Sequence, residues 1–140
     1  MAQILIVVAA YVFLLMGVAH AALTLRDLKR PRAFTPKDAS LRLVMQQSSV
    51  ALHPAINLWD AWLGFSMTHS LGLALFGGGF LYVGIFEPYA FAASWLLQAT
   101  AVLVSAIYLI VSIKFFFFKP AVGSAIGLVG FLVATVLAYA

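Results

Sequence analysis

Apolar residues fill four long stretches of this 140-residue chain, and shorter polar segments separate them. Each stretch reaches the ~20 residues that an α-helix needs to cross the hydrocarbon core of a bilayer. Lipid offers the backbone no hydrogen-bond partner, so a single apolar segment that spans a membrane satisfies its own backbone groups as a helix. The pattern therefore predicts four transmembrane helices, at about 3–25, 58–83, 90–113 and 121–139.

The first stretch has a competing interpretation as a cleaved signal peptide. Ala19-His20-Ala21 has the small-x-small form of a cleavage site after an apolar core. The stretch starts without a basic residue, however, and its apolar run is longer than a usual signal core. These two features favour a transmembrane helix.

The segment between the first two spans has helical periodicity at lower hydropathy. Thr35-Pro36-Lys37-Asp38 has the order of a helix start, with Thr35 as the predicted N-cap and Pro36 in the first turn. Apolar residues then recur every three or four positions until Pro54 interrupts the pattern. We expect an amphipathic helix over Pro36–Leu52, lying along the cytoplasmic membrane surface. A re-entrant segment is the alternative, which Arg42 and its neighbouring glutamines disfavour.

The second span carries a start signal and an interruption. Asn57 is the predicted N-cap, and Asp60 falls in the first turn, where the helix dipole favours an anion. Gly77-Gly78-Gly79 follows near its far end. Consecutive glycines lower helix stability, so we expect the helix to loosen there.

Composition sets the class of protein. Hydrophobic residues make up 65% of the chain and charged residues 9%, and the mean hydropathy is +1.10. Soluble domains carry ~45–50% apolar and ~25% charged residues. The expected fold is therefore an all-α integral membrane protein, a four-transmembrane-helix bundle with one interfacial helix, forming a single domain over 1–140. The absence of cysteine excludes disulfides and thiol nucleophiles.

The basic residues are concentrated in two segments, 26–42 and 114–119, which the helix pattern places on one side of the membrane. The positive-inside rule assigns that side to the cytoplasm. Both termini are then expected on the non-cytoplasmic side. The membrane is expected to be the bacterial inner membrane. Basic residues beside a span also attract anionic lipid headgroups, here at Arg26, Lys29, Arg30 and Arg32.

Small residues form two stripes that predict close helix packing. In the second span they are Gly64, Thr68 and Gly72, and in the fourth span Gly123, Gly127 and Gly130. Small side chains let two helix backbones approach each other. Other transmembrane helices, of this chain or of a partner, are the expected neighbours.

Polar residues inside the spans define the candidate site. Counted at ~1.5 Å per residue from the cytoplasmic boundary, His69 lies ~15 Å deep and His20 ~9 Å deep, and Ser105 and Tyr108 fall at similar depths. Trp62 and Phe65 share a helix face with His69. Plain interhelical hydrogen bonding is the leading interpretation.

Three functional interpretations of these residues stay open. The histidines could ligate a haem or another metallated pigment, with the two estimated depths ~6 Å apart. They could equally bind a quinone or take part in a proton relay. No bound cofactor at all is the simplest expectation.

Enzymatic motifs are missing from the sequence. It contains no Gly-rich phosphate loop, no HExxH and no serine elbow. Asp60 and His69 are about half a turn out of phase on one helix and cannot form a dyad from that helix alone. We predict no catalytic residues and no metal site, and favour a protein that is not an enzyme.

The stretch from Gly64 to Gly72, GFSMTHSLG, resembles a segment of small bacterial four-helix membrane proteins that carry Gly-Phe-x-x-x-His and have no assigned function. The resemblance implies no activity. With so little soluble surface, we expect an accessory or scaffold subunit of a larger membrane complex, respiratory or photosynthetic, that interacts with lipid. The alternative is a small ligand-binding protein or enzyme that uses the His69 face for haem, pigment, quinone or lipid.

Overall fold

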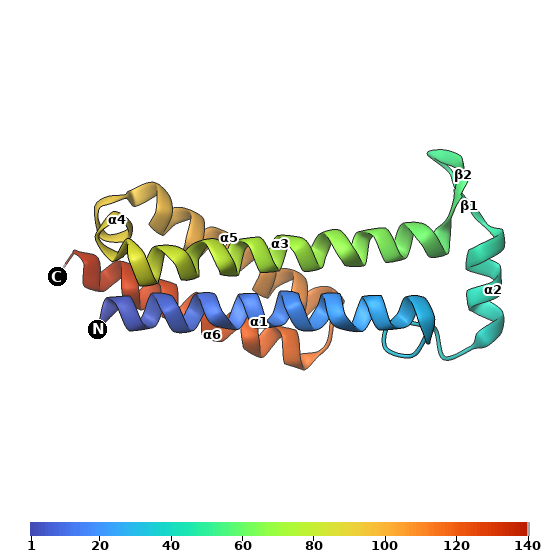
Figure 1. Cartoon of the computed structure of the whole chain (residues 1–140), viewed down its shortest axis with the longest axis horizontal. Helices are drawn as coiled ribbons and strands as arrows, with labels where there is room; N and C mark the ends of the chain where they lie inside the picture. The colour runs from blue at the N-terminus through green and yellow to red at the C-terminus, as the bar shows by residue number, and fades with distance from the viewer. Residues whose placement is uncertain (140) are drawn as a thin grey trace. The chain divides into compact units, whose positions relative to one another are not determined.

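Four long helices account for the four apolar stretches (Figure 1). They are α1 (Ala2–Lys29), α3 (Leu58–Phe86), α5 (Trp95–Phe115) and α6 (Phe118–Ala138). The computed structural model describes residues 1–139. All four helices are long and apolar enough to cross a membrane, so the predicted number of helices of spanning length is confirmed and the chain is consistent with an integral membrane protein.

The chain divides into two compact units. The bundle unit comprises Met1–Met16 and the chain from Leu73 onward, and the histidine unit comprises Gly17–Gly72. Helices α1 and α3 each run from one unit into the other without a break.

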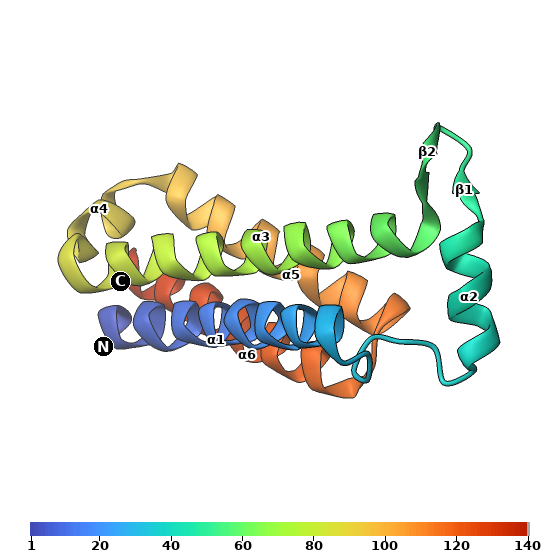
Figure 2. The same ribbon diagram turned by 45° about the vertical axis from the view of Figure 1, so that its right-hand side comes forward.

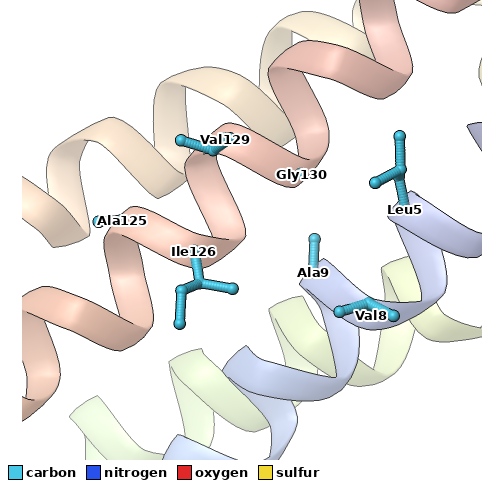
Figure 3. Close-up of a pocket in the computed structure, with 7 residues that line it drawn as sticks. All are labelled: Leu5, Val8, Ala9, Ala125, Ile126, Val129 and Gly130. Atoms are coloured by element: carbon cyan, nitrogen blue, oxygen red, sulfur yellow. The ribbon is translucent and has the colours of Figure 1, made fainter.

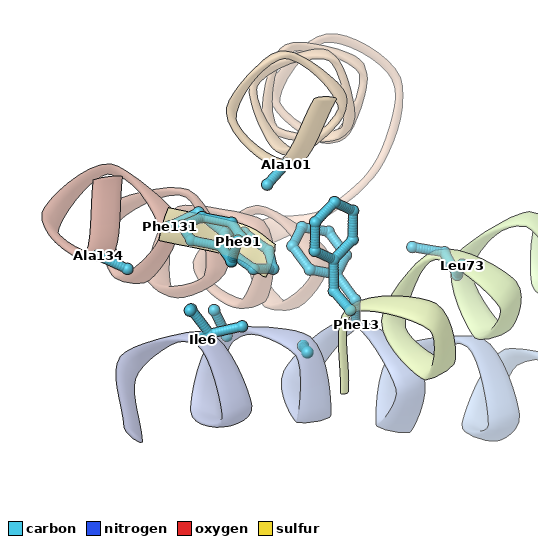
Figure 4. Packing of buried hydrophobic residues seen from close by; sticks show 10 residues of the cluster. Ile6, Phe13, Leu73, Phe91, Ala101, Phe131 and Ala134 are labelled. Carbon is cyan, nitrogen blue, oxygen red and sulfur yellow. The ribbon is translucent and has the colours of Figure 1, made fainter. Parts of the chain in front are cut away.

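The bundle unit has a core of aromatic and small side chains (Figure 4). Phe13 and Phe131 are fully buried in it, and Phe80 is nearly so. The ring of Phe13 meets that of Phe76 edge-on, with 5.0 Å between centroids, and Phe80 meets Phe131 at 5.2 Å. Lipid tails are as apolar as these rings, so close packing and edge-to-face geometry hold the helices together better than hydrophobic transfer does.

Glycines bring α1 close to its neighbours inside the bundle unit. Gly77 of α3 faces the α1 backbone, so a Cβ there would overlap Leu14. In α6, a Cβ on Gly127 would overlap the ring of Phe13, and one on Gly130 would lie 2.9 Å from the Cβ of Ala9. The glycine stripe of the fourth span therefore packs against α1 of the same chain.

The glycine run did not loosen α3. The helix continues from Leu58 to Phe86 without interruption, so the expected loosening at Gly77-Gly78-Gly79 is wrong. The contact of Gly77 with α1 explains the difference, because packing against a neighbouring backbone offsets the conformational entropy that glycine loses in a helix.

The predicted third span is two helices. A short helix α4 (Pro88–Ala93) precedes α5, and Ser94 separates them in an extended conformation. The Ser94 hydroxyl accepts the backbone N–H of Leu97 at 3.3 Å and so caps the start of α5.

The buried side chain of Gln98 stabilises this break. Its Nε2 donates to the carbonyl oxygens of Phe91 at 2.9 Å and Ala92 at 3.1 Å, which end α4. The Tyr139 hydroxyl donates to Gln98 Oε1 at 2.7 Å. The helix end therefore keeps its hydrogen bonds without water.

At the other end of α5, only Phe116 and Phe117 connect it to α6. The two helices pack against each other. Helix α6 begins at Phe118, three residues earlier than predicted, which leaves Pro120 in its first turn, where no backbone donor is needed.

The segment between α1 and α3 is only partly helical. Helix α2 covers Ala39–Gln47, and two short strands follow, β1 (Ser49–Val50) and β2 (His53–Asn57), which pair antiparallel. The prediction of a helix over 36–52 is therefore too long at both ends. Pro54 restricts the preceding residue to extended geometry, which favours a strand over further helix.

The N-cap of α2 is Asp38 and not Thr35. The Asp38 carboxylate accepts the backbone N–H of Ser40 at 2.8 Å and its hydroxyl at 2.7 Å. The bond from the Ser40 hydroxyl, and to a lesser extent that from its backbone N–H, hold the pKa of Asp38 below its usual value. Helix α2 buries no residue and runs across the direction of the α1 and α3 segments of the histidine unit (Figure 2).

The predicted start of α3 is confirmed. Asn57 Oδ1 accepts the backbone N–H of Asp60 at 2.8 Å, and Asn57 Nδ2 donates to Asp60 Oδ2 at 2.8 Å. Asn57 thus caps the helix, and the Asp60 carboxylate holds the Asn57 side chain in place.

Candidate functional site

His20 of α1 and His69 of α3 meet inside the histidine unit. Their ring centroids are 5.1 Å apart and the rings lie edge to face, at 67°. Both side chains are partly buried. The estimated depth difference of ~6 Å was too large, because α1 extends to Lys29 rather than to Leu25. With the observed helix ends the same count leaves ~3 Å between the two positions, which the side chains span.

The loop after α1 covers the His20 ring of this pair. The ring of Phe34 stacks on His20 with 4.4 Å between centroids and 26° between planes. The backbone carbonyl of Phe34 accepts the indole N–H of Trp62 at 3.2 Å. One loop residue therefore connects the α1 histidine to the first turns of α3.

A buried carboxylate holds the loop in place. Asp27 Oδ1 accepts the backbone N–H groups of Arg32 at 3.0 Å and Ala33 at 2.9 Å, and Oδ2 accepts that of Phe34 at 2.6 Å. The Thr35 hydroxyl donates to Oδ2 at 3.3 Å. Asp27 is 1% exposed and lies in the last turn of α1, where the helix dipole opposes an anion. These four donors compensate its burial and its position.

Asp27 is the residue that the sequence reasoning missed. It stands among the basic residues of 26–32 and was read only as part of a positively charged segment. A signal was present, because an acidic residue in the last turn of a helix needs donors that the helix itself does not provide.

A cavity of about 380 Å³ adjoins the loop within the histidine unit. Phe34 is shared between this cavity and the stack on His20, so a small molecule in the cavity would touch the ring that covers His20. The cavity is lined by Ala33, Phe34, Thr35, Pro36, Met45 and Trp62.

The remaining predicted site residues are described within their own units. Phe65 is on the outer side of α3 and is 75% exposed, so it does not wall in His69. Ser105 and Tyr108 belong to the bundle unit, where Ser105 is fully buried and the Tyr108 ring lies 5.8 Å from that of Phe13. Within the histidine unit, the structure brings together His20, His69 and, through Phe34, Trp62.

A second hollow, of about 430 Å³, lies between α1 and α6 in the bundle unit (Figure 3). Its walls are aliphatic and carry no polar side chain, so it can accommodate hydrocarbon but offers no chemistry. The lining residues are Leu5, Val8, Ala9, Ala125, Ile126, Val129 and Gly130.

The fold and the site define a class: a small helical protein with four potential membrane spans, a pair of contacting histidines, and a loop held by a buried aspartate. Comparison of the chain with family models, curated proteins and solved structures gives no match. Its function is therefore argued from its own geometry.

Proposed function

We propose that this protein is an accessory subunit of a larger membrane complex, which it joins through the outer face of α3. Gly64, Thr68 and Gly72 lie four residues apart on this face and all three are exposed. A Cβ on Gly64 would meet nothing within 4 Å. The Thr68 hydroxyl donates to the carbonyl of Phe65, one turn back in its own helix, at 3.0 Å.

The contrast with α6 supports this proposal. Both helices carry small residues at three- or four-residue spacing, but in α6 the glycines face Met16, Phe13 and Ala9 of α1. Small residues gain little from facing lipid and allow a second helix to approach closely. A transmembrane helix of a partner subunit is the occupant that best matches the open α3 face.

The proposed setting is the bacterial inner membrane, with the histidine-unit loops on the cytoplasmic side. The basic side chains that would touch anionic headgroups are all exposed around the end of α1, which favours this orientation. They are Arg26, Lys29, Arg30 and Arg32. Helix α2, which buries no residue, would lie along the same membrane surface.

Reporter fusions test this orientation. We expect a fusion after Ala140 to be active only as a periplasmic reporter, and a fusion within the loop at Lys37 only as a cytoplasmic one, because the Lys and Arg residues flank the same ends of the helices. A cytoplasmic signal from Ala140 would contradict the proposed topology.

Substitution of the α3 face tests the subunit role. We expect Gly64→Leu to remove the protein from a complex that the wild-type chain forms in its native membrane, as measured by native gel electrophoresis after mild detergent extraction. Leucine favours a helix over glycine by up to ~1 kcal/mol, so the isolated chain should keep its fold.

Ala22→Leu is the matched control, because it places the same leucine side chain at an exposed position of α1 in the same unit. It should leave the complex intact. Wild-type protein that migrates as a single chain, or a Gly64→Leu protein that stays in the complex, would refute the proposed function.

A further inference from the structure

The two histidine rings have the spacing of a chelating pair. We propose that His20 and His69 together bind one divalent first-row transition-metal ion, such as Cu²⁺ or Zn²⁺. This site is independent of the proposed subunit role, because it lies on the contact between α1 and α3 rather than on the outer face of α3.

The distance between the rings carries the proposal. A metal ion lies ~2 Å from a ligating imidazole nitrogen and therefore ~3 Å from the ring centre. At a tetrahedral angle, the centres of two ligating rings are ~5 Å apart. The observed separation of 5.1 Å, with the planes at 67°, matches this arrangement.

The same geometry does not fit a haem held by both histidines. Ligation on opposite sides of an iron requires ring centres ~6 Å apart with the porphyrin between them. Here the ring centres are 5.1 Å apart, which leaves no space for a macrocycle between them. A small ion bound by one nitrogen of each ring requires no such separation.

The chemistry of the surroundings narrows the ligand class. Neutral imidazole is a ligand that Cu²⁺, Ni²⁺ and Zn²⁺ share, with Cu²⁺ bound most strongly of the three. Within residues 1–139, no group of three or more His, Cys, Asp or Glu side chains could hold a metal ion. The pair therefore supplies two ligands, and water or a small exchangeable ligand would complete the coordination, as in open metal sites.

Phe34 borders both this site and the neighbouring cavity. Its ring lies on His20 and also lines the cavity of about 380 Å³. The Asp27 carboxylate accepts the backbone N–H of Phe34 and so holds the Phe34 ring in its position on His20.

Metal titration of the purified full-length chain tests the proposal. The protein is prepared in mild detergent without a polyhistidine tag, and Cu²⁺ is added while electron paramagnetic resonance is recorded. We expect one Cu²⁺ per chain, with hyperfine splitting from two imidazole nitrogens. Because Cu²⁺ binds more tightly, only a large excess of Zn²⁺ should release the copper from the same site.

Histidine variants supply the controls. His20→Gln and His69→Gln, which each keep a hydrogen-bonding group, should weaken binding by at least the about tenfold that loss of a supporting partner costs a metal ligand. His53→Gln should leave binding unchanged, because His53 is exposed on β2. No stoichiometric copper, a signal with fewer than two nitrogens in the wild-type protein, or loss of binding in His53→Gln alone would overturn the proposal.

Discussion

Gly127→Leu is expected to destabilise the bundle unit severely. Gly127 is buried in α6, and a Cβ at this position would already overlap the ring of Phe13, which is itself fully buried. Phe13 contacts the rings of Phe76 and Phe131, so it has no free direction in which to move. Overpacking of a filled core costs ~1–3 kcal/mol and at times more. We expect the upper end of that range, seen as a fall of about 10 °C in the melting temperature of the detergent-solubilised protein.

Gly79→Leu is the matched control for this substitution. It makes the same chemical change in an apolar helix of the same unit, but a Cβ on Gly79 would meet nothing within 4 Å. Its melting temperature should be unchanged or slightly raised, because leucine favours a helix over glycine. Equal melting temperatures for the Gly127 and Gly79 variants would show that the packing of α6 against α1 is not as described.

Asp27→Asn is expected to release the loop that covers the His20 ring. The carboxylate accepts three backbone N–H groups and one hydroxyl, and an amide can accept at only one of its two positions. Buried donors left without a partner cost about 2 kcal/mol, which corresponds to about a 30-fold larger population of the open loop. Limited digestion with trypsin should then cut after Arg32 about 30-fold faster, since cleavage follows the open population.

Asp60→Asn is the control for this second change. Asp60 is also a helix-terminal carboxylate of the histidine unit, but it is exposed and accepts a hydrogen bond from the side chain of Asn57. Cleavage after Arg32 should stay at the wild-type rate. If the Asp27→Asn variant is cleaved by trypsin as slowly as the wild-type chain, then the hydrogen bonds to Asp27 do not hold the loop.

The helices and their caps were predictable from the sequence where local signals are strong. Four apolar runs of sufficient length predict four spanning helices, whatever their neighbours. Asn57 and Asp60 formed the expected cap because their partners lie three residues apart in the chain. Such signals need no knowledge of tertiary structure.

Features that depend on tertiary contacts were not predictable in this way. The continuity of α3 through its glycines depends on α1, and the break at Ser94 depends on Gln98, whose partners lie six and seven residues back. The Asp27 bonds reach five to eight residues ahead, and they exist only if the loop folds back. A helix-period pattern does not contain this information.

The candidate site shows the same division. His20 and His69 were identified as polar residues within apolar spans, but their meeting depended on where α1 ends. A shift of four residues in that end changes an estimated depth by ~6 Å, which is more than the separation between the two rings. Phe34 was absent from the predicted site because a loop residue carries no periodic signal.

The short connection between α5 and α6 has a consequence for how the protein is made. Phe116 and Phe117 alone separate the two helices, with Lys114 in the last turn of α5 and Lys119 in the first turn of α6. So short a link, without a polar loop between the helices, couples their entry into the bilayer. The two helices should therefore leave the translocation machinery together as a preformed hairpin, and a ribosome that stalls before α6 emerges would leave α5 without its partner.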